Sequence, residues 1–149
     1  MTEPYRPLVR SQADLHAMWR HLMEPLGFGY SRVYVVFVPP GGGVIPRITE
    51  ISELPEVPDR ATALNFLDVC AELMDTAMPT GTRVAFLYAR PGGPALTAAD
   101  RAWGAGLLSA ADELFVPYWP VHVANDHVLR VLAPDDLAST GWLADRPTG

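Results

Sequence analysis

Lysine is absent from this sequence of 149 residues, and cysteine occurs once, as Cys70. A single cysteine excludes an intrachain disulfide and any zinc or iron–sulfur site built from several thiolates. Its place on a helical apolar stripe favours a small buried hydrophobe over a reactive thiol. Because lysine is absent, all eleven cationic side chains are arginines, spread singly over a chain of net charge −6. No basic stripe results, so we expect no nucleic-acid partner.

Long apolar runs are also missing. No segment approaches the roughly 18 to 20 apolar residues that a membrane span needs, and Glu3 and Pro4 do not fit a signal peptide. We therefore expect a cytoplasmic protein with no membrane contact. The composition, 49% hydrophobic and 19% charged, is that of one globular domain with a sizeable core. The pattern divides the chain into an N-terminal extension (residues 1–9), a domain (10–137) and a C-terminal tail (138–149).

Three segments carry apolar residues at helical spacing. The first follows the capping signal Ser11-Gln-Ala-Asp14 and ends before Pro25. The second spans about residues 60–78, and its apolar stripe extends to Ala77. The third spans about residues 97–114. Each of these segments is therefore predicted to be a helix with one buried face.

Other segments read as strands. Arg32–Val38 has almost no polar residues, which predicts a central strand covered on both faces. A Pro/Gly cluster leads to residues 44–51, the expected hairpin partner, and Pro46 within them indicates a sheet edge or a bulge. Residues 84–88 form a further strand, and residues 116–132 form a terminal hairpin around a two-residue Asn-Asp turn. These elements predict an α/β (α+β) single domain.

The four histidines offer limited scope for a metal or catalytic site. His16 and His21 lie about 140° apart around the first helix, so surface exposure is expected for both. In the terminal hairpin, His122 and His127 are expected on one face as diagonal neighbours with Asp126 near, which leaves a two-histidine metal site conceivable. Ordinary surface histidines are the favoured interpretation. An enzyme of another class would have to use one of this pair, because the sequence has neither a Gly-x-Ser-x-Gly nucleophile elbow nor a lysine.

The stretch from residue 84 to residue 100 organises the chain: an apolar strand runs into a Pro/Gly loop, and a capping signal then opens a helix. In this corner and in its order of elements, the sequence resembles the JAB/MPN fold, most closely its RadC-like branch, over about residues 10–137. The resemblance implies a mixed β-sheet flanked by about three helices. The residues of this degenerate motif, also a possible ligand loop, are Tyr88, Arg90, Pro91, Gly92, Gly93, Thr97 and Asp100.

In catalytic members of that family the strand ends in His-x-His, Pro-Ser-Gly follows, and Ser-x-x-Asp opens the helix. Both histidines and the aspartate bind zinc, and a glutamate at the start of the first strand is the general acid/base. Here Tyr88 and Arg90 stand at the histidine positions, the loop is one residue shorter, and the glutamate position falls near Ser31 or Arg32. Only Asp100 matches a ligand, and a guanidinium repels a metal and offers it no lone pair.

The resemblance therefore implies a catalytically inactive, metal-free domain with no cofactor, acting as a protein-binding or scaffold module. A protein partner or self-association as a homodimer is expected, through aromatic residues such as Tyr118, Trp119 and Trp142. Partial burial in the core is the equally supported interpretation of these three side chains. Asp100 also has a structural explanation, as the last residue of a capping box with Thr97.

A second interpretation places a small-anion or nucleotide site at the same corner. Arg90, the Gly92-Gly93 backbone and the helix N-terminus near Thr97 would supply positive charge and N–H donors. The pattern is not a P-loop, because no Gly-Lys-Ser/Thr follows, and the Asp100 carboxylate would oppose an anion.

Overall fold

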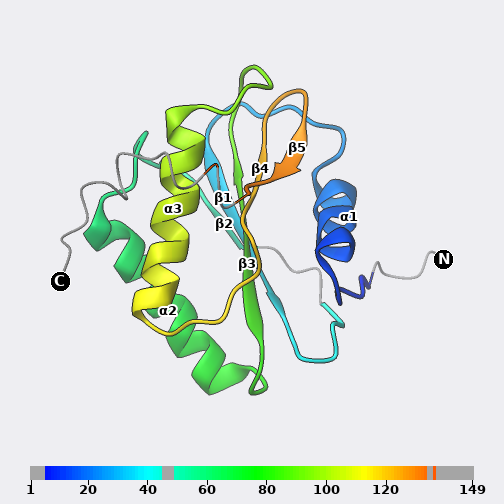
Figure 1. Cartoon of the computed structure of the whole chain (residues 1–149), viewed down its shortest axis with the longest axis vertical. Coiled ribbons are helices and arrows are strands. Elements are labelled where there is room, and N and C mark those ends of the chain that lie inside the picture. Colours follow the sequence, from blue (N-terminus) through cyan, green and yellow to red (C-terminus); the bar gives the residue numbers. More distant parts are fainter. Residues whose placement is uncertain (1–5, 45–48, 134–135, 137–149) are drawn as a thin grey trace.

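The computed structural model describes residues 6–44, 49–133 and 136, and within them one five-stranded sheet lies between helices (Figure 1). The strand order is β2-β1-β3-β4-β5; β3 and β4 are parallel, and the other neighbours are antiparallel. The predicted α/β class, with a mixed sheet and three helices, is confirmed. The elements are α1 (Gln12–Met23), β1 (Arg32–Val38), β2 (Thr49–Ile51), α2 (Arg60–Ala77), β3 (Arg83–Ala89), α3 (Ala98–Glu113), β4 (His122–Ala124) and β5 (Leu129–Val131).

Helices cover both faces of the sheet: α2 and α3 lie on one side, and α1 on the other (Figure 1). Successive side chains of a strand point to opposite faces, so β1 contributes to two separate cores. Val33 and Val35 belong to the cluster under α2 and α3, whereas Val36 and Val38 belong to the cluster that includes α1. The expectation that Arg32–Val38 is a strand covered on both faces is confirmed, with the predicted bounds.

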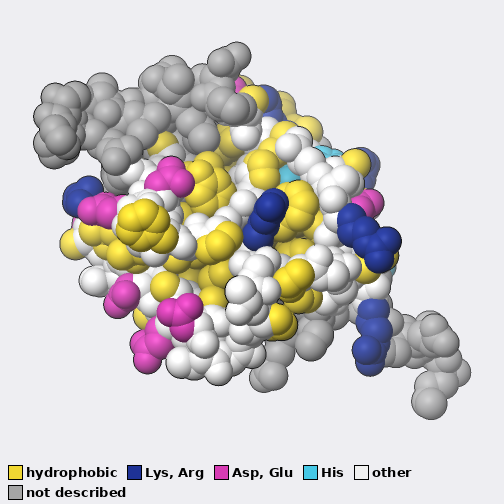
Figure 2. All heavy atoms as spheres, turned by 60° about the horizontal axis from the view of Figure 1, so that its bottom comes forward, with side chains coloured by type: hydrophobic (Ala, Val, Ile, Leu, Met, Phe, Trp, Pro, Cys, Tyr) yellow, Lys and Arg dark blue, Asp and Glu magenta, His cyan; other side chains and the backbone are white. Residues whose placement is uncertain are grey.

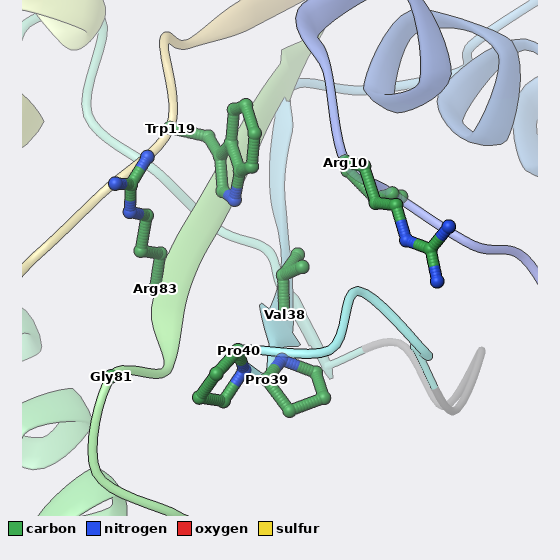
Figure 3. A pocket seen from close by; sticks show the side chains of 8 residues that line it. Arg10, Val38, Pro39, Pro40, Gly81, Arg83 and Trp119 are labelled. Carbon is green, nitrogen blue, oxygen red and sulfur yellow. The ribbon is translucent and has the colours of Figure 1, made fainter.

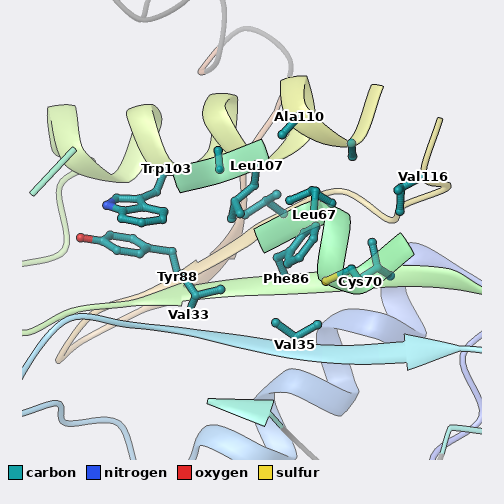
Figure 4. Close-up of a cluster of buried hydrophobic side chains, with 14 of the residues drawn as sticks. Val33, Val35, Leu67, Cys70, Phe86, Tyr88, Trp103, Leu107, Ala110 and Val116 are labelled. Carbon is teal, nitrogen blue, oxygen red and sulfur yellow. The ribbon is translucent and has the colours of Figure 1, made fainter. Parts of the chain in front are cut away.

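The larger cluster fills the space between the sheet and the helices α2 and α3 (Figure 4). Phe86 of β3, Leu67 of α2 and Leu107 of α3 are all fully buried in it. The apolar stripe predicted for α2 is right up to Cys70 and at Met74, but wrong at Leu73 and Ala77. Leu73 is 42% exposed and Ala77 is exposed, so the packed part of α2 ends before its C-terminus.

Side-chain oxygens cap the N-termini of all three helices. At α1 the Ser11 hydroxyl accepts the Asp14 N–H (3.1 Å), as predicted. The Asp14 carboxylate accepts the N–H of Arg10 (3.0 Å) in place of the Ser11 N–H, so the second hydrogen bond of a capping box is not made. Asp59 caps α2 by accepting the N–H of Thr62 (2.7 Å). Each cap satisfies a backbone donor that has no partner inside its helix.

The terminal hairpin differs from its prediction. Instead of a two-residue turn, residues 125–128 form the connection, and Ala124 pairs with Leu129. The cause is the Asn125 side chain, whose Oδ1 accepts the N–H groups of both His127 and Val128 (2.8 and 2.9 Å). Asn125 and Val128 stay linked by one backbone hydrogen bond, from the Asn125 N–H to the Val128 carbonyl (3.0 Å), and the side-chain bonds supply the other acceptor for the turn. The predicted strand over residues 116–124 is regular only from residue 122, after a single bridge between Tyr118 and Val84.

The edge strand and the N-terminal boundary differ from their predictions. Within the hairpin partner expected over residues 44–51, Thr49–Ile51 pairs with β1 as the edge strand β2, and residues 45–48, which include Pro46, lie outside the described residues. Val9, assigned to the N-terminal extension, is 2% exposed and packs in the cluster with α1. The tail over residues 138–149, which contains Trp142, lies outside the described residues.

Candidate functional site

The corner after β3 is built around a buried ion pair. Arg90 directly follows β3, and Asp100 lies in the first turn of α3. The Arg90 Nε donates to Asp100 Oδ1 at 2.8 Å, and Nη2 donates to Asp100 Oδ2 at 2.9 Å. Arg90 is 7% exposed and Asp100 is 1% exposed. This bidentate, nearly dry geometry is the strong form of a charge-assisted hydrogen bond.

The remaining donors of Arg90 are directed into its own loop. Nη1 donates to the carbonyl of Pro91 (3.1 Å), and Nη2 donates a second time, to the carbonyl of Ala95 (2.9 Å). The hydrogen bonds that Arg90 donates to Asp100 raise the pKa of the guanidinium, which stays charged. Because its charge is balanced and its donors are used inside the protein, Arg90 has little left to offer an external anion.

Asp100 also completes the cap of α3. Its Oδ2 accepts the N–H of Thr97 (2.9 Å), and the Thr97 hydroxyl accepts the N–H of Asp100 (3.1 Å). The predicted capping box is confirmed. The same carboxylate therefore neutralises Arg90 and closes the helix N-terminus, so both of its oxygens are engaged.

The carboxylate of Asp126 accepts a backbone hydrogen bond from the exposed part of the loop that joins β3 to α3. Gly92 has φ +111°, and a Cβ at this position would lie 3.1 Å from Arg90 Nη1. The Gly92 N–H donates to Asp126 Oδ2 (2.8 Å), and the N–H of Phe28 donates to Oδ1 (3.0 Å). These two donors, that of Gly92 first, lower the pKa of Asp126. The sequence predicts Asp126 near a histidine pair, and nothing in its Asn-Asp context points to this bridging role.

Tyr88 lies on the same face of β3 as Arg90, two residues earlier, and is 2% exposed. Its ring stacks on Trp103, with the ring centres 5.7 Å apart and the planes 12° apart (Figure 4). Burial raises the pKa of the Tyr88 hydroxyl, whereas a hydrogen bond with Ser31 opposes the shift. Trp103 Nε1 donates in turn to the carbonyl of Pro55 (3.2 Å). The structure thus brings Tyr88 and the Arg90–Asp100 pair together beside Ser31.

The sequence matches no protein-family model and no curated protein. The resemblance to the JAB/MPN fold consequently stays an expectation based on the motif residues. Of the motif residues, Tyr88, Arg90, Thr97 and Asp100 meet at one corner, and Pro91, Gly92 and Gly93 are exposed in the loop between them.

His21 and His127 are exposed, as predicted, whereas His16 and His122 are not. His127 is exposed in the β4–β5 loop, so the expected face shared by His122 and His127 does not form. His122 is completely buried, and its ring centre lies 5.5 Å from that of His16, which is half-buried on α1. The surface placement predicted for His122 and His16 is wrong, because β4 pairs with Leu87 of β3 and directs His122 toward α1. Burial, then the proximity of His16, lowers the pKa of His122 to about 4.

Other candidate groups are accounted for by packing. Cys70 is buried, which raises the pKa of its thiol to about 11 and fits the predicted structural role. Tyr118 and Trp119 are half-buried, and the Tyr118 hydroxyl donates to Asp112 (2.9 Å). Within the described residues, no three His, Cys, Asp or Glu side chains are grouped so that they could share a metal ion. Among these same residues, no helix combines the length and apolar character needed to cross a bilayer.

Proposed function

We propose that this chain is a metal-free, non-catalytic JAB/MPN-type module, most similar to the RadC-like branch, that binds a protein partner or a second copy of itself. One observation carries the proposal: the Arg90 guanidinium occupies a position where the resembled family has a zinc-binding histidine, and it pairs with the one matching ligand, Asp100.

The chemistry of the pair opposes zinc binding. A metal would need lone pairs from Asp100, but both of its oxygens already accept charge-assisted hydrogen bonds from Arg90, and Oδ2 also accepts the Thr97 N–H. Releasing the carboxylate would leave the Arg90 charge buried without a partner, which costs about 3–5 kcal/mol in comparable pairs. A zinc-activated water therefore has no supporting set of residues at this corner.

Exposed apolar side chains support a role in binding another protein. Phe115, the second residue after α3, is 92% exposed and has φ 56°, an unusual backbone conformation for an aromatic residue. On the outer side of α2, Val69 is 65% exposed and Leu73 is 42% exposed. Val69 and Leu73 are one helical turn apart and so form one small apolar patch, and burial of this patch and of Phe115 by a partner would stabilise a complex.

Zinc content tests the metal-free part of the proposal. The purified, tag-free protein is incubated with excess zinc, desalted and measured by plasma mass spectrometry, with Arg90→His in parallel. We expect far less than one zinc per wild-type chain. A stoichiometric, tightly held zinc in the wild type that is lost in Asp100→Asn would overturn the proposal.

Sedimentation velocity over a range of concentrations tests self-association. If two copies associate through the exposed apolar side chains, we expect a dimer that Phe115→Ser converts to monomer, while the exposed-surface control Asp75→Ser does not. A wild-type monomer at every concentration would contradict the homodimer. The proposed partner would then have to be a different protein.

A further inference from the structure

A pocket of about 350 Å³ lies at the end of the sheet remote from the Arg90–Asp100 pair. It forms where β1 ends and β3 begins, and Val38 and Arg83 are paired in the sheet at that point. Because Arg90 follows the opposite end of β3, the whole length of the strand separates the two sites. Stretches far apart in the sequence meet in its wall, which includes Val9, Arg10, Val38, Pro40, Arg83 and Trp119 (Figure 3).

Backbone hydrogen bonds fix this wall. The N–H of Val9 donates to the carbonyl of Gly42 (2.7 Å), and the N–H of Trp119 donates to the carbonyl of Val84 (2.9 Å). Gly42 has φ +85°, and a Cβ there would lie 2.6 Å from the Val9 carbonyl oxygen, so the two segments meet closely only because residue 42 is glycine. A ligand would therefore meet walls that are already formed, which lowers the entropic cost of binding.

The lining of the pocket is positively charged. It contains two arginines and no acidic residue. Neither Arg10 nor Arg83 forms an ion pair with any residue that the structure describes. In a chain of net charge −6, two such guanidiniums at one hollow create a local positive potential. The arginines that do pair with carboxylates are Arg20, Arg32, Arg60, Arg90 and Arg130.

Figure 2 turns this end of the molecule forward. Near the middle of the face, a dark-blue side chain lies among yellow and white ones, and most of the magenta acidic side chains lie to its left. The central basic side chain has no acidic side chain beside it, whereas at the left and right edges of this face blue and magenta side chains lie next to each other. An anion approaching its centre would meet apolar and basic groups with few carboxylates between them.

Trp119 adds an unused donor to this wall. Its indole N–H is buried and has no hydrogen-bond partner among the described residues. The Arg83 guanidinium carbon lies 5.2 Å from the centre of the Trp119 ring. Figure 3 shows the indole nitrogen directed toward the space bounded by Val38 and Pro40, with Arg10 on the opposite side from Arg83. A buried donor without an acceptor is costly, and a bound oxyanion would relieve that cost.

We propose that this pocket binds a small organic anion, in which a carboxylate or phosphate group is attached to a flat apolar body. Arg83 and the Trp119 indole N–H would bind the oxyanion, and Arg10 would add positive charge across the opening. The apolar body would contact Val38 and Pro40 and the face of the indole. The volume of about 350 Å³ is within the range of small-molecule sites, and the lining combines two arginines with apolar side chains, which suits a ligand with one charged and one apolar part.

Isothermal titration calorimetry of the full chain tests the ligand class. The probes are 1-naphthyl phosphate, 1-naphthoate, the uncharged 1-naphthalenemethanol and inorganic phosphate. We expect at least one of the two naphthyl anions to bind at least tenfold more tightly than both the uncharged alcohol and inorganic phosphate, and the better of the two identifies the oxyanion. No binding of either naphthyl anion at millimolar concentration, or equal binding of the alcohol, would overturn the proposal.

Variants locate the binding. Arg83→Gln and Arg10→Gln should each weaken binding of the preferred anion by about tenfold, because each removes one charged donor or a nearby charge. Trp119→Phe keeps an aromatic ring but loses the N–H, and should also weaken binding. The control Arg20→Gln makes the same charge change on the exposed side of α1, where Arg20 pairs with Glu24, and should leave affinity unchanged. Equal losses in Arg20→Gln and Arg83→Gln would contradict a site in this pocket.

Discussion

The Arg90 guanidinium and the Asp100 carboxylate form a buried bidentate pair across the loop that joins β3 to α3, with nitrogen–oxygen distances of 2.8 and 2.9 Å. The pair fixes the geometry of the corner because Arg90 also donates to carbonyls within the loop and Asp100 also caps α3. A charge that is compensated in this way holds a loop in one conformation. It does not provide an empty binding site.

Removal of one charge from this pair should be strongly destabilising. Asp100→Asn keeps the size of the side chain but leaves the Arg90 charge buried without its counter-ion. We expect the free energy of unfolding to fall by about 3 kcal/mol or more, measured by urea denaturation at neutral pH.

The double variant Arg90→Gln/Asp100→Asn separates the loss of the pair from the loss of other packing. It removes both charges, so its loss of unfolding free energy should be smaller than the sum of the losses in Arg90→Gln and Asp100→Asn by more than about 1 kcal/mol. Strict additivity of the two single variants would show that the pair is not an energetic unit. Circular dichroism of each variant at low temperature checks that the helices are retained.

The two loop glycines should respond differently to alanine. Gly92→Ala places a side chain at φ +111° and a Cβ 3.1 Å from Arg90 Nη1, whereas a Cβ at Gly93 meets nothing within 4 Å and Gly93 has no positive φ. We expect Gly92→Ala to lower the unfolding free energy by about 1 kcal/mol or more, and Gly93→Ala to change it by less than about 0.5 kcal/mol. Thermal unfolding of the two variants side by side gives the comparison. Equal effects would mean that Gly92 is not required by its backbone conformation.

The sequence predicted well those elements that depend on local pattern. The apolar run Arg32–Val38 gave its bounds and its two covered faces, and Thr97 and Asp100 form the predicted capping box. The Arg90–Asp100 pair was not foreseen, because ten residues separate its members and only the fold of the loop between them turns the side chains toward each other. For Asn125, side-chain bonding to the backbone outweighed the short turn that the sequence favoured.

His122 escaped prediction for a related reason: its burial follows from the parallel pairing of β4 with β3, a long-range contact that no local pattern reveals. Residues 116–121, which precede β4, form no regular strand, and the sequence around β4 does not indicate that it lies inside the sheet between β3 and β5. Its environment nevertheless has a measurable consequence. A histidine held neutral by burial against the half-buried ring of His16 makes folding depend on pH.

We expect acid to destabilise the protein through His122. Its pKa is about 4 in the folded protein, and about 6.5 in an unfolded chain, so the unfolded chain binds the proton first as the pH falls. The contribution of His122 to the free energy of unfolding is fully present above about pH 6.5 and declines as the pH falls toward about 4. The total loss is about 3 kcal/mol. His122→Leu should therefore show a smaller decrease in unfolding free energy between pH 7 and pH 4.5 than the wild type, by urea denaturation at each pH. His127→Gln, at an exposed loop position, should keep the wild-type slope, and a His122→Leu slope equal to it would contradict the buried neutral state.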